Sequence, residues 1–247
     1  MKILTSPSVL ACDFLHLADE IRRADASGSD WLHCDVMDGM FVPNMSFGFD
    51  TIRAINTVSD LPLDVHMMVN NPAQFIDMMN LGKDDYLCIH YEGDIHAQRT
   101  LAKIKDKGIK AGLALNPQTP VNCYEHLIDY LDMALVMTVS PGFAGQKMFL
   151  GAEKKVAEAK ALLKEWNCED MLIEVDGNVS LENGRKLCRS GADIFVLGTS
   201  ALFLKEKNVL QKNNLKGGKN EQRTISKADQ LFVKEVRRPS KKRGFFG

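Results

Sequence analysis

Short apolar runs recur along the chain at fairly even spacing, and most of them are rich in β-branched or aliphatic residues. Such runs are typical of buried strands, and stretches between them repeat an apolar residue every three or four positions, as amphipathic helices do. Eight runs are candidate strands: Ile3–Leu10, Trp31–Val36, Leu63–Met67, Tyr86–Ile89, Lys110–Leu115, Ala134–Val139, Met171–Val175 and Ile194–Leu197. The clearest candidate helices are Phe14–Ala26, Pro72–Leu81, Ala97–Lys107 and Ala152–Trp166.

The regular alternation of strand and helix predicts an α/β fold with a parallel sheet and right-handed strand–helix–strand connections. Eight such units can close into a (β/α)8 TIM barrel, and an open doubly wound sheet is the alternative. Glycines occur where a helix gives way to the next strand, for example at Gly28, Gly108 and Gly191. These joints belong to one end of a barrel, so we expect the chemistry at the opposite, carboxyl ends of the strands.

Charge is distributed unevenly along the 247 residues. Residues 205–247 carry 13 Lys or Arg against 4 Asp or Glu, so the net charge is near +9 there and near −10 in the remainder. We therefore expect a barrel domain at 1–204 and a basic, partly disordered extension at 205–247. No aromatic-rich recognition motif accompanies the basic residues, so a nucleic-acid partner is not expected.

Neither a membrane segment nor a disulfide framework is indicated. No apolar run approaches the length of a membrane span, which predicts a protein without a membrane partner. The cysteines are scattered, with no Cys-x-x-Cys pair, as in reduced cytoplasmic proteins. They are Cys12, Cys34, Cys88, Cys123, Cys168 and Cys188.

Histidines and carboxylates stand at the ends of three predicted strands. One strand ends at His33-Cys34-Asp35, another at Asp64-Val65-His66 and a third at Glu174-Val175-Asp176. Residues two apart share a face of a strand, and strand ends converge around a barrel axis, so two histidines and two aspartates can meet. A lone inward histidine is usually structural, but four such residues on one rim favour a divalent metal ion. Their nitrogen and oxygen atoms suit zinc, iron(II), manganese or cobalt.

Two further groups of residues lie on the same rim. Met37, Met68 and Met137 stand at or just beyond strand ends, where thioethers can form an apolar ceiling over a reactive centre. Small residues follow the last three strands, and backbone amides exposed there favour a phosphate. The predicted phosphate-binding residues are Gly142, Phe143, Ala144, Gly145, Gly177, Asn178, Gly198 and Thr199.

The residues at these strand ends resemble the ribulose-phosphate 3-epimerase family over nearly all of residues 3–203. The matching strings are Ser6-Pro-Ser-Val-Leu10, His33-x-Asp-Val-Met-Asp-Gly-x-Phe-Val-Pro-Asn44, Asp64-Val-His-Met-Met-Val69, Met137-Thr-Val-x-Pro-Gly-Phe-Ala-Gly-Gln146 and Glu174-Val-Asp-Gly177. The resemblance implies that His33, Asp35, His66 and Asp176 bind the metal. It also implies that Asp35 and Asp176 move protons, that Ser8 and His66 touch the substrate, and that the glycine loops hold its phosphate.

The resemblance further implies a metal-dependent isomerase of the pentose phosphate pathway, often a homo-oligomer. It would invert carbon 3 of a small phosphorylated ketose, converting D-ribulose 5-phosphate to D-xylulose 5-phosphate through an enediolate. Met40 departs from the family's usual histidine. Ala144, Asn178 and Gly198–Ser200 look instead like the sibling D-allulose 6-phosphate 3-epimerases, which act on a hexulose phosphate. A non-catalytic sugar-phosphate-binding barrel is the remaining alternative, although the ligand set and the proton pair are both intact.

Overall fold

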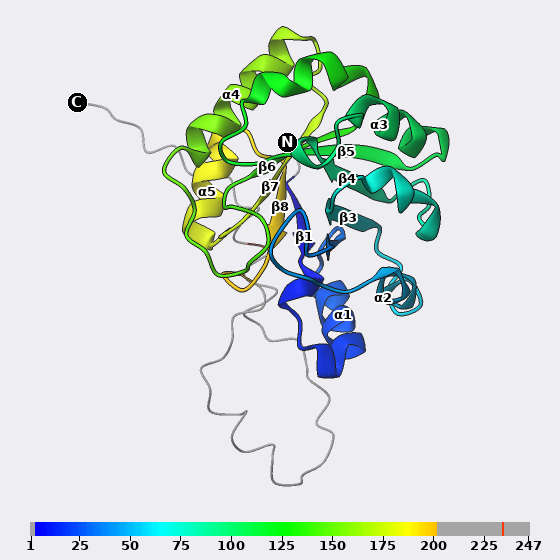
Figure 1. Cartoon of the computed structure of the whole chain (residues 1–247). Helices are drawn as coiled ribbons and strands as arrows, with labels where there is room; N and C mark the ends of the chain where they lie inside the picture. Colours follow the sequence, from blue (N-terminus) through cyan, green and yellow to red (C-terminus); the bar gives the residue numbers. More distant parts are fainter. Residues whose placement is uncertain (1–2, 202–233, 235–247) are drawn as a thin grey trace, which may run out of the picture.

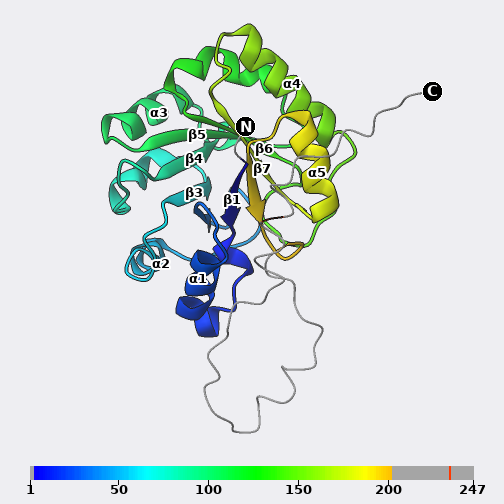
Figure 2. The same ribbon diagram turned by 180° about the vertical axis from the view of Figure 1, so that it is seen from behind.

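The computed structural model describes residues 3–201 and residue 234, and within them eight parallel strands form one sheet. The strands follow one another around the sheet in the order β1-β8-β7-β6-β5-β4-β3-β2. Their bounds are β1 Leu4–Pro7, β2 Leu32–Met37, β3 Leu63–Met68, β4 Tyr86–His90, β5 Lys110–Leu115, β6 Met133–Met137, β7 Leu172–Asp176 and β8 Ile194–Leu197. Figure 1 shows these strands enclosed by the helices, and Figure 2 shows the same arrangement from behind.

The sheet closes where β1 meets β2, a junction that we call the seam. Ser8 and His33 form an isolated parallel bridge there. The amides of Asp30 and Trp31 both donate to the carbonyl of Thr5, with N···O distances of 3.0 and 3.2 Å. The (β/α)8 barrel is therefore confirmed, and the open doubly wound alternative is wrong.

Helices cover the outside of the barrel. Their bounds are α1 Leu17–Ala26, α2 Phe49–Ile55, α3 Ala97–Asp106, α4 Ala152–Glu165 and α5 Leu181–Ser190. Short 3-10 segments complete the connections: η1 Val9–Ala11, η2 Phe14–His16, η3 Pro72–Gln74, η4 Ile76–Met78, η5 Tyr91–Gly93 and η6 Val121–Tyr130.

The helix predicted over Pro72–Leu81 is wrong, because that stretch forms two 3-10 turns, η3 and η4. The backbone turns extended at Met79, with φ −101° and ψ 136°, so no continuous ladder of i to i−4 hydrogen bonds can form. An apolar residue every three or four positions fits a 3-10 turn nearly as well as an α-helix. The pattern therefore predicted burial correctly and the helix type incorrectly.

Side chains on alternate faces of the strands pack in two apolar regions, one beneath the helices and one inside the barrel. Inside the barrel, a polar layer lies between the apolar region and the site. Outward side chains such as Cys34 and Val65 pack in the main core beneath the helices. Inside the barrel an apolar plug includes Trp31 and Tyr86, whose ring centroids lie 4.5 Å apart. Further along the axis the same inward face of β2 carries His33 and then Asp35, both buried. The interior is thus apolar at one end and polar toward the carboxyl ends of the strands.

The remaining expectations concern the tail, the membrane and the thiols. Apart from Lys234, the predicted basic extension 205–247 lies outside the described residues, so the division at residue 204 stays a proposal. Among residues 3–201, no helix is both long enough and apolar enough to cross a bilayer. All six cysteines are free thiols.

Candidate active site

Three strands bring two imidazoles and two carboxylates together inside the barrel. His33 and Asp35 come from β2, His66 from β3 and Asp176 from β7. One nitrogen or oxygen atom from each lies within 4.8 Å of those of the others. The two histidines are fully buried, and 18% of the Asp176 side chain is exposed. We call these four residues the ligand cluster.

The atoms that face one another in the ligand cluster are arranged as metal ligands are. Asp35 Oδ1 lies 3.2 Å from His33 Nε2 and 3.3 Å from His66 Nδ1, and His66 Nδ1 lies 3.7 Å from Asp176 Oδ2. His33 Nε2 is buried, and no group in the described part of the chain makes a hydrogen bond to it. A buried imidazole nitrogen of this kind, aimed at two carboxylates, fits a cation ligand.

The orientation of His33 is fixed from behind by Asp64. The distance between His33 Nδ1 and Asp64 Oδ2 is 2.5 Å, and Asp64 Oδ2 also accepts from Ser6 Oγ at 3.2 Å. A proton on Nδ1 is therefore directed at Asp64, and Nε2 is the nitrogen that faces the ligand cluster. Carboxylates commonly orient metal-binding histidines in this way.

The two aspartates of the ligand cluster differ in proton affinity. Burial alone would raise the pKa of Asp35, but the neighbouring His33 and His66 imidazoles bring this pKa below its ordinary range. Burial and the charge of Asp35 raise the pKa of Asp176 to about 6. Two carboxylates with separated proton affinities are the usual basis for assigning an acid and a base.

The negative charge of the site favours a positive charge among its side chains. Burial lowers the pKa of His33, but the carboxylates of Asp64 and Asp35 outweigh burial and bring it well above 6.5. Glu174 lies in the same buried layer, with Oε1 3.8 Å from His33 Nδ1. Burial and the charge of Asp64 raise the pKa of Glu174 far above its ordinary value, so we interpret Glu174 as a neutral carboxyl.

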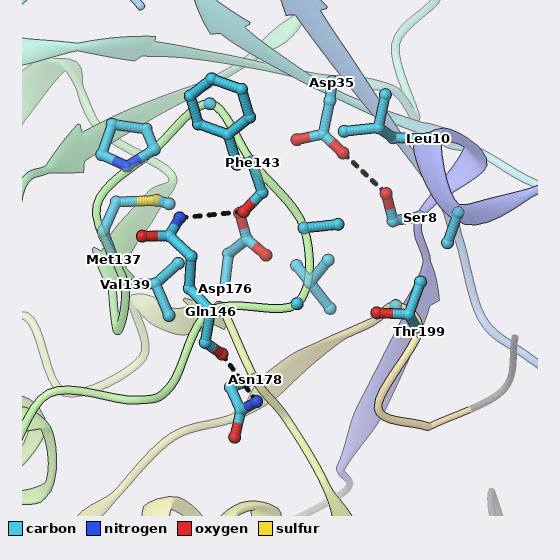
Figure 3. Close-up of a pocket in the computed structure, with 18 of the residues that line it drawn as sticks. Ser8, Leu10, Asp35, Met137, Val139, Phe143, Gln146, Asp176, Asn178 and Thr199 are labelled. Atoms are coloured by element: carbon cyan, nitrogen blue, oxygen red, sulfur yellow. Dashed lines mark hydrogen bonds between the residues drawn. The ribbon is translucent and has the colours of Figure 1, made fainter. Parts of the chain in front are cut away.

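A pocket of about 620 Å³, including space open to solvent, lies above the ligand cluster. A pocket of this size suits a small ligand. Figure 3 shows Asp35 and Asp176 among the side chains that line it. The other predicted site residues on its wall are Ser8, Met37, Met68, Met137, Gly142, Phe143, Ala144, Gly145, Gly177, Asn178, Gly198 and Thr199. His33 and His66 are not on this wall, and Met40 is 77% exposed outside it.

Side-chain amides hold the small-residue loops of the pocket in place. Asn44 Nδ2 donates to the Gly142 carbonyl at 2.7 Å, and Gln146 Nε2 donates to the Phe143 carbonyl at 2.9 Å. Asn178 Nδ2 donates to the Gln146 carbonyl at 2.7 Å and to Ser200 Oγ at 3.3 Å. The Asn178 side chain thus joins the loops after β6, β7 and β8, and Figure 3 shows its bond to Gln146.

Sequence reasoning missed a second row of residues around the cluster. His66 Nε2 lies 2.8 Å from His90 Nε2, and His90 Nδ1 lies 3.2 Å from Glu92 Oε2. Burial lowers the pKa of His90 to about 4, against the opposing effect of the hydrogen bond to Glu92. One signal was present in the sequence, because His90-x-Glu92 at the end of β4 repeats the spacing of His33-x-Asp35 in β2.

Known proteins share the sequence pattern and the fold of this chain. The sequence matches the ribulose-phosphate 3 epimerase family over residues 4–203. It is 43% identical to the ribulose-phosphate 3-epimerase of Bacillus subtilis (strain 168) over 198 residues, which cover 80% of this chain and 91% of the relative. It is 39% identical to a chloroplastic ribulose-5-phosphate-3-epimerase of Arabidopsis thaliana over 207 residues, which cover 83% and 73%. The crystal structure of a 3-hexulose-6-phosphate synthase shares the fold, with a TM-score of 0.57 at 14% identity over 96% of this chain and 98% of that one.

Proposed function

This chain belongs to the ribulose-phosphate 3-epimerase family of carbohydrate isomerases, and we propose that it interconverts D-ribulose 5-phosphate and D-xylulose 5-phosphate. The observation that carries the proposal is the pair of carboxylates, Asp35 and Asp176, which reach one pocket from β2 and β7 with different proton affinities. Family membership favours an enzyme over a non-catalytic binding barrel. The names of both relatives favour a pentulose phosphate over a hexulose phosphate.

We assign one divalent metal ion to His33, Asp35, His66 and Asp176. The assignment is supported by the mixed nitrogen and oxygen donor set and by the buried Nε2 of His33, which faces Asp35 without a hydrogen bond from the described residues. Such an ion supplies Lewis-acid chemistry, which lowers the cost of removing a proton beside a carbonyl by several kcal/mol.

Inversion at carbon 3 requires one proton carrier on each face of a flat enediolate. Asp35 accepts the proton in one direction, and Asp176 returns a proton to the opposite face. In the reverse direction the two residues exchange roles. Ser8 Oγ donates to Asp35 Oδ2 at 2.6 Å, which fixes the orientation of this carboxylate at the pocket wall (Figure 3).

The substrate phosphate is assigned to the loops after β6, β7 and β8. The proposed phosphate-binding groups are the backbone amides of Gly142–Gly145, Gly177–Asn178 and Gly198–Thr199. These residues all line the pocket. Gly142, Gly145 and Gly177 have positive φ angles of 111°, 81° and 118°, which glycine adopts without a side-chain clash. A row of exposed amides in such loops forms a concave anion site.

Steady-state kinetics on two substrates test the proposed function. We expect the purified protein to convert D-ribulose 5-phosphate to D-xylulose 5-phosphate with a higher kcat/KM than for D-allulose 6-phosphate. This expectation rests on the names of the two relatives, both of which act on ribulose phosphate. A higher kcat/KM for the hexulose phosphate would instead support the allulose alternative, and no turnover of either would contradict the assignment as an epimerase.

Metal analysis of alanine variants tests the ligand cluster. We expect about one ion per wild-type chain and a clear loss of the ion from each of the variants at His33, Asp35, His66 and Asp176, because each removes one ligand atom. The measurement is elemental analysis after dialysis against a weak chelator. Asp19→Ala is the control, since that carboxylate is exposed on α1, forms an ion pair with Arg22 and is not part of the ligand cluster. Full occupancy in all four cluster variants would show that the ion binds elsewhere or not at all.

A further inference from the structure

A line of hydrogen bonds leads from the ligand cluster to a carboxylate that belongs neither to the cluster nor to the pocket wall. It begins at His66 on β3, passes through His90 at the end of β4 and ends at Glu92. The two imidazoles are fully buried, with ring centroids 4.9 Å apart and ring planes inclined by 30°. Phe41 covers His90 with its ring centroid 4.6 Å away, so His90 has little freedom to turn.

Glu92 is held as a carboxylate acceptor by groups on another part of the barrel. Its Oε1 accepts from the backbone amide of Asn116 at 2.8 Å and from the hydroxyl of Thr119. Its other oxygen, Oε2, faces His90 Nδ1 at 3.2 Å. An ionised carboxylate can only accept hydrogen bonds, so the proton in this contact lies on His90 Nδ1.

The position of that proton determines the state of the next ring. A neutral imidazole with its proton on Nδ1 has a lone pair on Nε2, so His90 Nε2 accepts the 2.8 Å hydrogen bond from His66 Nε2. A second proton on His90 would place a charge at a fully buried position, which is unfavourable. His66 therefore carries its proton on Nε2, and its Nδ1 is the nitrogen that faces Asp35 and Asp176 at 3.3 and 3.7 Å.

We propose that His90 and Glu92 are positioning residues that select the tautomer of His66, so that its Nδ1 lone pair is directed into the ligand cluster. The proposal rests on the metal site of the proposed function. His33 is oriented by one carboxylate in direct contact, Asp64, whereas His66 is oriented by a carboxylate that acts through an intervening imidazole. The two imidazoles of the cluster thus have separate supports.

The variant Glu92→Gln tests this directional argument, because it preserves size and reverses one hydrogen bond. The Asn116 N–H needs an acceptor, so the oxygen of the new amide must remain on that side. The amide NH2 of the new side chain then faces His90. His90 then accepts at Nδ1 and donates from Nε2, and His66 accepts at Nε2 and carries its proton on Nδ1. The nitrogen directed at the ligand cluster would lose its lone pair although no cluster residue has been changed.

His90→Gln is the matched conservative variant, because a glutamine amide can reproduce the polarity of this imidazole. Its NH2 can donate to Glu92 while its oxygen accepts from His66 Nε2, so the tautomer of His66 is retained. Glu125→Gln controls for the charge change, since Glu125 is exposed on η6. If these residues only fill space, Glu92→Gln and His90→Gln should weaken zinc binding to a similar extent. Tautomer selection predicts that only Glu92→Gln weakens zinc binding.

Two measurements on the full chain decide between these outcomes. Nitrogen-15 NMR of the metal-free protein reports whether His66 Nε2 carries a proton, with the signal assigned through its loss in His66→Asn. Competition with a chromogenic chelator gives the zinc dissociation constant. We expect a protonated Nε2 in wild type, His90→Gln and Glu125→Gln, and an unprotonated Nε2 in Glu92→Gln with roughly 10- to 100-fold weaker zinc binding.

An unchanged His66 spectrum in Glu92→Gln would overturn the proposal, as would equal losses of zinc affinity in Glu92→Gln and His90→Gln. The proposed function fails differently. If wild-type protein bound no divalent ion in the chelator assay, the metal assignment would be wrong, while the NMR spectra would still report whether Glu92 sets the tautomer of His66.

Discussion

Asp176→Asn is expected to lose net epimerisation by about 10²- to 10⁴-fold while retaining proton exchange at carbon 3 of one epimer. Asparagine keeps the size of the side chain and one oxygen for the ligand cluster, but it cannot carry a proton between substrate and solvent. Asp35 remains able to remove and return a proton on its own face. NMR of each ketose phosphate in D2O follows both reactions, because deuterium at carbon 3 reports exchange and the appearance of the other epimer reports inversion.

Asp35→Asn is the matched variant, and it should show exchange in the opposite epimer. Both variants need their metal content measured, since each change also alters a residue of the ligand cluster. Wild type should incorporate solvent deuterium at carbon 3 during turnover. Full epimerase activity in either metal-loaded variant would contradict the assignment of two bases, and so would wild-type turnover without any deuterium at carbon 3.

Gly177→Ala is expected to destabilise the fold by roughly 2 to 5 kcal/mol and to raise KM. The backbone of Gly177 has φ 118°, outside the usual range of residues with a side chain. An added Cβ would lie 2.6 Å from Val139 Cγ2 and 2.9 Å from Thr138 Oγ1. Relief of this contact must move the loop after β7, whose amides are assigned to the substrate phosphate. Thermal or denaturant unfolding measures the first effect and steady-state kinetics the second.

Gly28→Ala is the control for backbone strain alone. Gly28 also has a positive φ, 81°, but nothing lies within 4 Å of a Cβ built there, and it sits at the other end of the barrel. We expect a loss of about 1 kcal/mol and an unchanged KM from this variant. Equal stability losses in the two variants would contradict the predicted crowding at Gly177. An unchanged KM in Gly177→Ala would contradict the assignment of the loop after β7 to the phosphate site.

The strands and the inner ring of the site were predictable because they depend on local periodicity. The runs Lys110–Leu115 and Ile194–Leu197 are strands with the predicted bounds, and the other six shift by a few residues. His33 and Asp35 share a face of β2 because side chains alternate in any strand. The convergence of β2, β3 and β7 follows once eight strands close a barrel. These inferences require no knowledge of how far one strand is displaced relative to the next.

The contacts that the sequence did not reveal depend on that displacement. His66 pairs with Cys88 in the register of β3 and β4, which places His90 two residues further along the same face and beside His66. Asp64 pairs with His33 in the register of β2 and β3. A shift of two residues would keep each side chain on the same face and break both contacts. Composition and periodicity do not specify this register. The oligomeric state of the protein stays a prediction.

The position of the seam between β1 and β2 links metal binding to the closure of the barrel. Around the barrel the cluster spans β7 and β2, and the seam lies between these two strands. An ion held by Asp176 on one side and by His33 and Asp35 on the other would clasp the barrel across this junction. Opening the seam would then separate the ligands, so the free energy of ion binding would add to the free energy of opening. By this linkage, the bound ion would also stabilise the closed form of the barrel.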